Sequence, residues 1–190
     1  MILKDKNVIL GITGGIAAYK ACDIIRALVK LEANVECILT ENAAKFITPL
    51  TLQTLSKNAV YCDMFEKIGK WEISHVSLAK KADIILIAPA TAEIISKLAC
   101  GSARDLLLCT VLASKAKVIV CPAMNENMFS HAATRKNIET LQGYGYEFVM
   151  PQTGELACGL SGDGRLADTQ TILKTVVGAL TQKRNNAEPL

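Results

Sequence analysis

Short, purely apolar runs alternate with stretches of helical periodicity along most of the chain. The apolar runs predict strands that are buried on both faces. Between them, apolar residues recur every three or four positions, as Ile24, Leu28 and Leu31 do, which predicts helices packed on a sheet. The predicted strands are Asn7–Ile12, Val35–Leu39, Ile84–Ala88, Val118–Cys121 and Tyr146–Met150, and the predicted helices are Gly15–Leu31, Thr51–Ser56, Ser74–Lys81, Thr91–Leu112 with a break near Gly101, Ala132–Gln142 and Thr169–Leu180.

This alternation of buried strands and helices is typical of a parallel sheet with helices on both faces. We therefore expect a doubly wound α/β fold of the Rossmann-like or flavodoxin-like kind. The chain has 190 residues, and domains usually hold roughly 100–200, so we expect a single domain. It should span residues 1–181, followed by a polar tail or severed linker at 182–190.

One segment departs from both periodicities. Gly154–Asp168 contains four glycines, and we expect it to lack regular structure. A long glycine-rich loop in a compact domain is usually functional. The prediction is a substrate lid at about 154–168.

Charge and composition restrict the function classes. The formal net charge is +3, and no basic stripe of a nucleic-acid binder is present. No apolar run approaches the ~20 residues of a membrane span, and the first residues lack the long apolar stretch of a signal peptide. We therefore expect a cytoplasmic protein that binds neither nucleic acid nor membrane.

The chain has seven cysteines, an odd number, and no C-x-x-C pair. This argues against a disulfide framework and against a zinc ribbon. Cys62 is ambiguous, whereas Cys158 lies in the glycine-rich loop, where it could either pack the loop or exchange a proton with a ligand. The other five fall in helix or strand patterns and are expected in the core: Cys22, Cys37, Cys100, Cys109 and Cys121.

Histidines are equally few. His75 precedes a predicted helix and His131 follows Phe129-Ser130. Two histidines without clustered carboxylates argue against a zinc site, and we expect no metal. From position alone, each is more often structural than catalytic.

In an open α/β sheet, ligands bind beyond the carboxyl ends of the strands. The first of these ends, G-I-T-G-G-I at residues 11–16, leads into a predicted helix. Its glycines could bring backbone N–H groups to an anion, and Thr13 could add a hydroxyl. A tight turn without a ligand remains the alternative, because the spacing matches neither the dinucleotide nor the P-loop fingerprint.

Three motifs carry a resemblance to a known family. They are P-A-M-N-E-N-M at 122–128, L-A-C-G with the following G-D-G-R-L, and His75 ahead of the segment A-D-I-I-L-I-A-P. On these motifs the chain resembles the flavin-containing cysteine decarboxylases from Val8 to about Ile172, and in particular the decarboxylase domain of bifunctional enzymes of coenzyme A biosynthesis. One motif departs, because Glu93 stands where the family often has asparagine.

The resemblance implies FMN as the cofactor, with the flavin phosphate held at the glycine turn. It implies that His75 acts near the flavin and the substrate thiol, that Asn125 holds the substrate carboxylate, and that Cys158 donates a proton. The implied cofactor-binding residues are Thr13, Gly14, Gly15, Ile16, Thr40, Asn42, Thr91, Ala92 and Ala123, and the implied substrate-binding residues are Asn125, Met128, Ala157, Cys158 and Gly159.

The activity that the resemblance implies is decarboxylation of 4′-phospho-N-pantothenoylcysteine to 4′-phosphopantetheine. The thiol would be oxidised to a thioaldehyde, CO₂ would leave, and the enethiolate would be reduced again. Alternatives on the same scaffold are a peptidyl-cysteine decarboxylase, a flavin prenyltransferase, or a non-catalytic FMN-binding regulator. The resemblance also implies a homo-oligomer, a trimer or dodecamer, and a phosphopantothenate–cysteine ligase domain or protein as a candidate partner.

Overall fold

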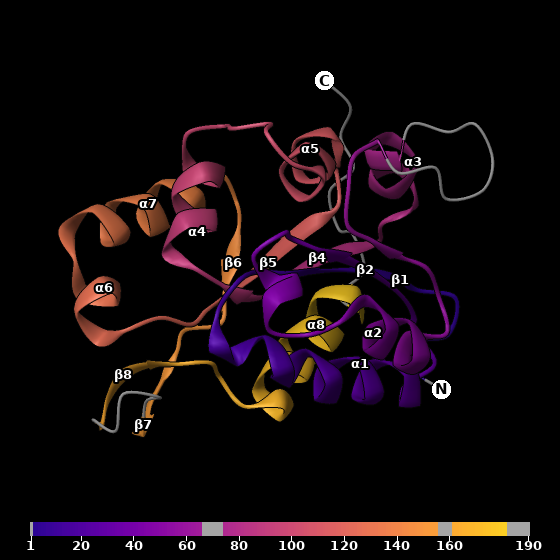
Figure 1. Ribbon diagram of the computed structural model, residues 1–190, viewed down its shortest axis with the longest axis horizontal. Coiled ribbons are helices and arrows are strands. Elements are labelled where there is room, and N and C mark those ends of the chain that lie inside the picture. The colour runs from indigo at the N-terminus through magenta and orange to yellow at the C-terminus, as the bar shows by residue number, and fades with distance from the viewer. Residues whose placement is uncertain (1, 66–73, 156–160, 182–190) are drawn as a thin grey trace.

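A computed structural model describes residues 2–65, 74–155 and 161–181, and it is built around one parallel sheet (Figure 1). The sheet has six strands in the order β3-β2-β1-β4-β5-β6, and a separate two-stranded sheet follows it. The strands are β1 (Asn7–Ile12), β2 (Asn34–Leu39), β3 (Val60–Tyr61), β4 (Ile84–Ala90), β5 (Lys117–Pro122), β6 (Glu147–Phe148), β7 (Gln152–Glu155) and β8 (Ser161–Arg165).

Helices connect these strands and cover the sheet. Two short 3₁₀ segments, η1 (Ile16–Lys20) and η2 (Ala43–Lys45), follow β1 and β2. The α-helices are α1 (Ala21–Lys30), α2 (Pro49–Ser56), α3 (Ser74–Lys81), α4 (Ala92–Ala99), α5 (Leu106–Ala113), α6 (Glu126–Ser130), α7 (Ala132–Gly143) and α8 (Thr169–Thr181).

The strand register explains why the central strands are apolar throughout. Leu10 of β1 pairs with Cys37 of β2 on one side and with Leu86 of β4 on the other, all in parallel. All seven residues of β4 are buried, as expected for a strand covered by helices on both faces. The predicted doubly wound parallel sheet is confirmed.

Alternate strand residues contribute to two separate cores. On one face, Leu10 packs with residues of α1, α2 and α8. On the other face, Ile9 packs with residues of α3, α4, α5 and α7. Figure 1 shows these two groups of helices on opposite sides of the sheet. Neither face of the sheet is left to solvent, so a ligand has access only at the strand ends.

Two predicted helices differ in detail. The helix expected at Gly15–Leu31 begins with the tighter η1 before α1 starts at Ala21. The helix expected at Thr91–Leu112 is two helices, α4 and α5, separated by a turn in which Gly101 has φ +68°. A positive φ suits glycine and ends a helix, in agreement with the predicted break.

The prediction of an irregular 154–168 segment is wrong for residues 154–155 and 161–165, which are strand, whereas residues 166–168 have no regular structure. β7 and β8 form an antiparallel hairpin in which Gly154 pairs with Gly162. Glycine disfavours an isolated strand, but it is tolerated where another backbone comes close. Here β8 lies against the connection that follows β5, and that contact, which the composition does not reveal, accounts for the regular structure.

The cysteine expectations are partly wrong. Cys37 and Cys121 are buried as expected, and Cys22 and Cys109 are half-buried. Cys100 is exposed, because it follows the last residue of α4 and its thiol reaches only the backbone oxygen of Lys97. Within the described ranges, no helix is long and apolar enough to cross a membrane.

Candidate functional site

A cavity of about 750 Å³ lies at the carboxyl ends of β1, β4 and β5. The strand order reverses between β1 and β4, and this switch point is where doubly wound sheets bind ligands. Three strand–helix connections and the end of β8 supply the walls. The lining residues are Gly14, Gly15, Ile16, Ala17, Tyr19, Lys20, Pro89, Thr91, Ala92, Glu93, Ala123, Met124, Asn125, Met128, Gly164, Arg165 and Leu166.

Thr13 joins two of these connections beneath the cavity. Its buried hydroxyl donates to the backbone oxygen of Pro89 at 2.7 Å and accepts from the backbone N–H of Thr91 at 3.1 Å. The hydroxyl hydrogen is therefore already used, and Thr13 is not among the lining residues. The structure gives Thr13 the role of holding the β1 and β4 ends in a fixed relation.

The glycine turn after β1 is pressed against the connection after β2. A Cβ on Gly14 would lie 2.4 Å from Cβ of Asn42, so only glycine fits there. Gly14, Gly15 and Ile16 line the cavity, but Thr40 and Asn42 do not. Thr40 accepts from the backbone N–H of Ala43 at 3.4 Å and Asn42 accepts from Lys45 at 3.0 Å, so both side chains bond within the connection after β2.

The connection after β5 places an amide at the cavity wall. Asn125 begins α6, and its side-chain oxygen accepts from the backbone N–H of Asn127 at 2.9 Å. This hydrogen bond fixes the amide orientation, and in the described structure its NH₂ group has no acceptor. Met128 lines the same wall and is 51% exposed. Two donors on a neutral amide are suited to a carboxylate.

The start of α4 forms the opposite wall. Thr91 caps this helix by accepting from the backbone N–H of Ile94 at 3.3 Å, and both Thr91 and Ala92 line the cavity, as does Ala123. Glu93 also lines it and forms an ion pair with Lys97 at 2.8 Å. The charge of Glu93, which stands where the family often has asparagine, is therefore balanced by a lysine of the same helix.

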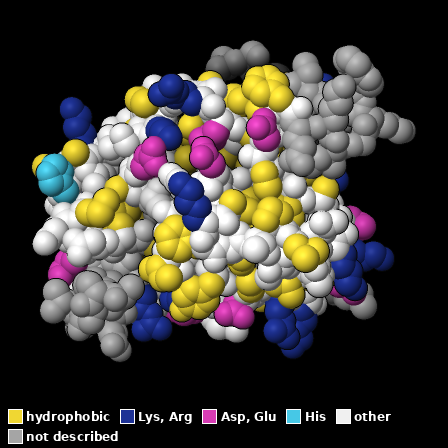
Figure 2. Space-filling model, in the orientation of Figure 1, with side chains coloured by type: hydrophobic (Ala, Val, Ile, Leu, Met, Phe, Trp, Pro, Cys, Tyr) yellow, Lys and Arg dark blue, Asp and Glu magenta, His cyan; other side chains and the backbone are white. Residues whose placement is uncertain are grey.

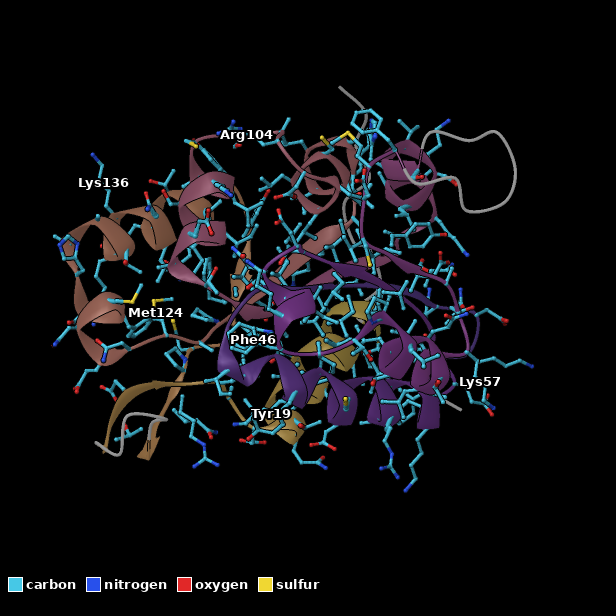
Figure 3. The ribbon with its side chains drawn as sticks, in the orientation of Figure 1. Tyr19, Phe46, Lys57, Arg104, Met124 and Lys136 are labelled. Carbon is cyan, nitrogen blue, oxygen red and sulfur yellow. The ribbon has the colours of Figure 1, made fainter. Side chains whose placement is uncertain are left out.

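The hairpin closes the cavity from the side of α6. The backbone N–H of Met124 donates to the backbone oxygen of Gly164 at 3.0 Å, and a Cβ on Gly164 would lie 2.1 Å from the Met124 oxygen. Figure 3 shows Met124 on the connection beside β8. The sequence analysis did not predict this contact, although the closely spaced glycines of G-D-G-R-L indicate a strand that another backbone can approach.

Two cavity cations were also missed by sequence reasoning. Lys20 ends η1 and Arg165 ends β8, and both line the cavity. Burial lowers the pKa of Lys20, and the positive charge of Arg165 lowers this pKa further, while Asp23 raises it. Arg165 belongs to a motif used for the resemblance, yet nothing in the spacing indicated that it shares the cavity with Lys20.

His75, the other predicted catalytic residue within the described parts of the chain, is not brought into this cavity. His75 is half-buried in the first turn of α3 and is not a lining residue, and its buried Nδ1 has no hydrogen-bond partner among the described residues. The loop residues Ala157, Cys158 and Gly159 and the tail at 182–190 lie outside the described residues.

Comparison with known proteins identifies the family. The Flavoprotein family profile matches residues 2–181. The chain belongs to the Flavoprotein family. It is 47% identical over 173 residues to the "Coenzyme A biosynthesis bifunctional protein CoaBC" of Bacillus subtilis (strain 168), which covers 91% of this chain and 43% of that protein. This Flavoprotein-family chain thus spans less than half the length of that relative.

Solved structures agree with the family. A mutant PPC decarboxylase complexed with pantothenoylaminoethenethiol matches with a TM-score of 0.80 and 28% identity, over 90% of this chain and 96% of that one. The FMN-dependent cysteine decarboxylase SpaF matches with a TM-score of 0.81 and 27% identity, over 93% and 96%. The predicted family is therefore confirmed.

Proposed function

We propose that the protein decarboxylates 4′-phospho-N-pantothenoylcysteine to 4′-phosphopantetheine with FMN as its cofactor. The observation that carries the proposal is a single cavity that joins the glycine turn, the start of α4 and Asn125 at the switch point of the sheet. The likeness to a bifunctional protein of coenzyme A biosynthesis and to a PPC decarboxylase supports this substrate.

The cavity residues fit FMN. The volume of about 750 Å³ lies within the ~300–1,000 Å³ of ligand pockets. Gly14, Gly15 and Ile16 offer backbone N–H groups to a phosphate, and Thr91, Ala92 and Ala123 present small side chains to a flat ring. FMN, when bound there, supplies the reversible oxidation of the substrate thiol.

Asn125 would bind the substrate carboxylate through its NH₂ group, which is oriented by the bond to Asn127. A neutral amide can position a carboxylate without the strong ground-state stabilisation that an arginine would give to a leaving group. Met128 would then contact the apolar part of the substrate. Cys158, which lies outside the described residues, would return a proton to the product.

His75 fits this scheme only if a second copy supplies it. It does not line the cavity of its own chain, although an unpaired imidazole nitrogen suits work on a thiol. Ile16 and Tyr19 line the cavity, and together with Phe46 they form an apolar patch in which each side chain is at least 48% exposed. Figure 2 shows hydrophobic side chains gathered on this face, and Figure 3 shows Tyr19 and Phe46 there.

Exposed apolar patches of this kind often mark interfaces. We therefore propose a homo-oligomer, a trimer or a dodecamer, in which a neighbouring copy covers the apolar patch and brings His75 to the cavity. A phosphopantothenate–cysteine ligase domain or protein remains a proposed partner, and a cytoplasmic location belongs to the same proposal.

The test of the activity is direct. Purified protein should be yellow or should become so with FMN, and it should release CO₂ from 4′-phospho-N-pantothenoylcysteine. Cys158→Ser should still release CO₂ but accumulate the oxidised enethiol. A protein that binds FMN and releases no CO₂ would indicate the regulator instead, and one that prefers a peptide ending in cysteine would indicate the peptidyl-cysteine decarboxylase.

The shared site has its own test. His75→Asn and Asn125→Asp should each be inactive as pure oligomers. After subunits are dissociated and mixed in equal amounts, about a quarter of the sites should pair two intact residues, if each site uses two copies. Recovery of about a quarter of wild-type activity supports the shared site, and no recovery in a correctly assembled mixture refutes it.

A further inference from the structure

The cavity contains two cations, Lys20 and Arg165. Neither Lys20 nor Arg165 forms an ion pair within the described parts of the chain, whereas the acid of the cavity wall, Glu93, is paired with Lys97 at 2.8 Å. Partial burial of Lys20 and the positive charge of Arg165 both disfavour the charged ammonium group unless an anion joins them. This part of the cavity is therefore suited to an anion.

The fold holds Arg165 in place. A Cβ on Gly154 would lie 3.1 Å from both Cδ and Nη1 of Arg165, so the arginine side chain runs across the bare backbone of β7. Gly154 itself pairs with Gly162 across the hairpin. Arg165 is thus positioned by the strand pairing. Lys20 is fixed by the end of η1, close enough for the guanidinium charge to act on its ammonium group.

We propose that Lys20 and Arg165 bind a phosphomonoester, and that this is the phosphate at the end of the substrate remote from the reacting cysteine. The guanidinium offers a planar pair of donors that matches two phosphate oxygens, and the ammonium adds a point charge. This assignment rests on the proposed function, because that substrate carries a phosphomonoester.

FMN also carries a phosphomonoester, so the two sources must be separated. The glycine turn precedes η1 and Lys20 ends it. Five residues of 3₁₀ helix span about 10 Å, so the turn and the end of η1 lie far enough apart for two different phosphates. Arg165 also ends β8, and three of the predicted substrate residues, at 157–159, come shortly before this strand in the sequence, whereas the predicted flavin residues lie on the main sheet connections. Both observations favour the substrate phosphate.

The pair would set substrate choice. A peptide ending in cysteine presents a carboxylate and a thiol to Asn125, but it has no phosphate for Lys20 and Arg165. Its binding would leave the two cations without an anionic partner. The protein should therefore select phosphorylated substrates over unphosphorylated ones.

The experiment uses the FMN-loaded protein and the products of the reaction as probes. Wild-type protein should bind 4′-phosphopantetheine at least about 10-fold more tightly than pantetheine, read from the flavin fluorescence, as expected for charge-assisted hydrogen bonds. Arg165→Gln and Lys20→Gln should each reduce this ratio by about 10-fold or abolish it, and Arg165→Lys should retain part of it. The ratio of kcat/KM for phosphorylated over unphosphorylated substrate should fall in parallel.

Arg26→Gln is the matched control, because it removes one positive charge from the exposed side of α1 and should leave the ratio unchanged. FMN affinity is measured for every variant by titration of the apoprotein. If FMN affinity falls while the ratio is unchanged, the pair binds the flavin phosphate and the proposal is overturned. Equal binding of both probes by wild-type protein overturns it too. If the probes are discriminated but neither substrate is decarboxylated, the proposed function fails and the phosphate site stands.

Discussion

Gly164→Ala tests how the hairpin is held on the cavity wall. The added Cβ would lie 2.1 Å from the backbone oxygen of Met124, whereas real Cβ contacts stay beyond 3.0 Å. β8 would therefore have to retreat by about 1 Å. The hydrogen bond from Met124 to Gly164, 3.0 Å long, would then stretch to about 4 Å and be lost.

The expected stability loss is about 2 kcal/mol, from one lost backbone hydrogen bond and the strain that remains. For a chain of this length that lowers the melting temperature by about 4–8 °C. A 1 Å displacement at a reacting group costs about 100-fold in rate, so kcat should fall by about that factor. Melting curves followed by circular dichroism, and CO₂ release under saturating substrate, measure the two effects.

Two further glycines serve as controls. A Cβ on Gly178 of α8 meets nothing within 4 Å, and Gly178→Ala should stabilise the helix by about 0.5–1 kcal/mol without affecting turnover. A Cβ on Gly162 would meet the side chain of Glu126, which is exposed and can swing away, so Gly162→Ala should cost much less than Gly164→Ala. Wild-type kcat and melting temperature in Gly164→Ala would refute the reasoning, and equal losses at positions 162 and 164 would contradict the role given to Met124.

Three other predictions follow from hydrogen bonds and burial. Thr13→Val leaves the Pro89 oxygen and the Thr91 N–H without their buried partner and should lower the unfolding free energy by about 2 kcal/mol. Thr13→Ser keeps the hydroxyl and should retain most of the wild-type stability. A denaturant titration in which the Val and Ser variants have equal stability would contradict this. Hydrogen bonds from Thr171 and Gln152 lower the pKa of Asp168 from 3.8 to about 2, so its stabilising effect is present above about pH 3.8 and is lost as the pH falls toward 2. The unfolding free energy of Asp168→Asn should therefore fall less than that of wild type as the pH is lowered from 3.8 to about 2. If the melting temperatures of both proteins fall in parallel over this pH range, the Asp168 carboxylate does not stabilise the fold. Burial raises the pKa of Cys121, and burial together with the charge of Glu36 raises the pKa of Cys37 to about 12. Iodoacetamide at pH 8 should therefore modify the exposed Cys100 long before either buried thiol, which peptide mass mapping can measure. Equal modification rates of the three cysteines in folded protein would contradict this prediction.

Sequence periodicity was sufficient for the main sheet because the strands are buried on both faces and therefore uniformly apolar. It could not reveal Glu36, which is 5% exposed within β2. The partners of this carboxylate are the hydroxyl of Tyr61 at 3.1 Å and the ammonium of Lys81, which lie 25 and 45 residues further along the chain. Such a pairing depends on tertiary contact and leaves no periodic signal.

The cavity residues also fall into those that local sequence predicts and those that depend on long-range contacts. The glycine turn and Asn125 were predictable because each directly follows an apolar strand. The approach of Lys20 to Arg165 was not, since it depends on where the hairpin docks, and docking depends on glycines that accept a neighbouring backbone. His75 illustrates a third limit: the motif marks it, yet one folded chain does not bring it to the cavity.

The β7–β8 hairpin shares no strand pairing with the six-stranded sheet. Its strand β8 approaches the body closely at Gly162 and Gly164 and supplies Gly164 and Arg165 to the cavity. The segment can therefore diverge in sequence without disturbing the cores on either face of the sheet. Transplanting it between family members would be a modular way to exchange substrate preference while the flavin-binding scaffold is inherited unchanged.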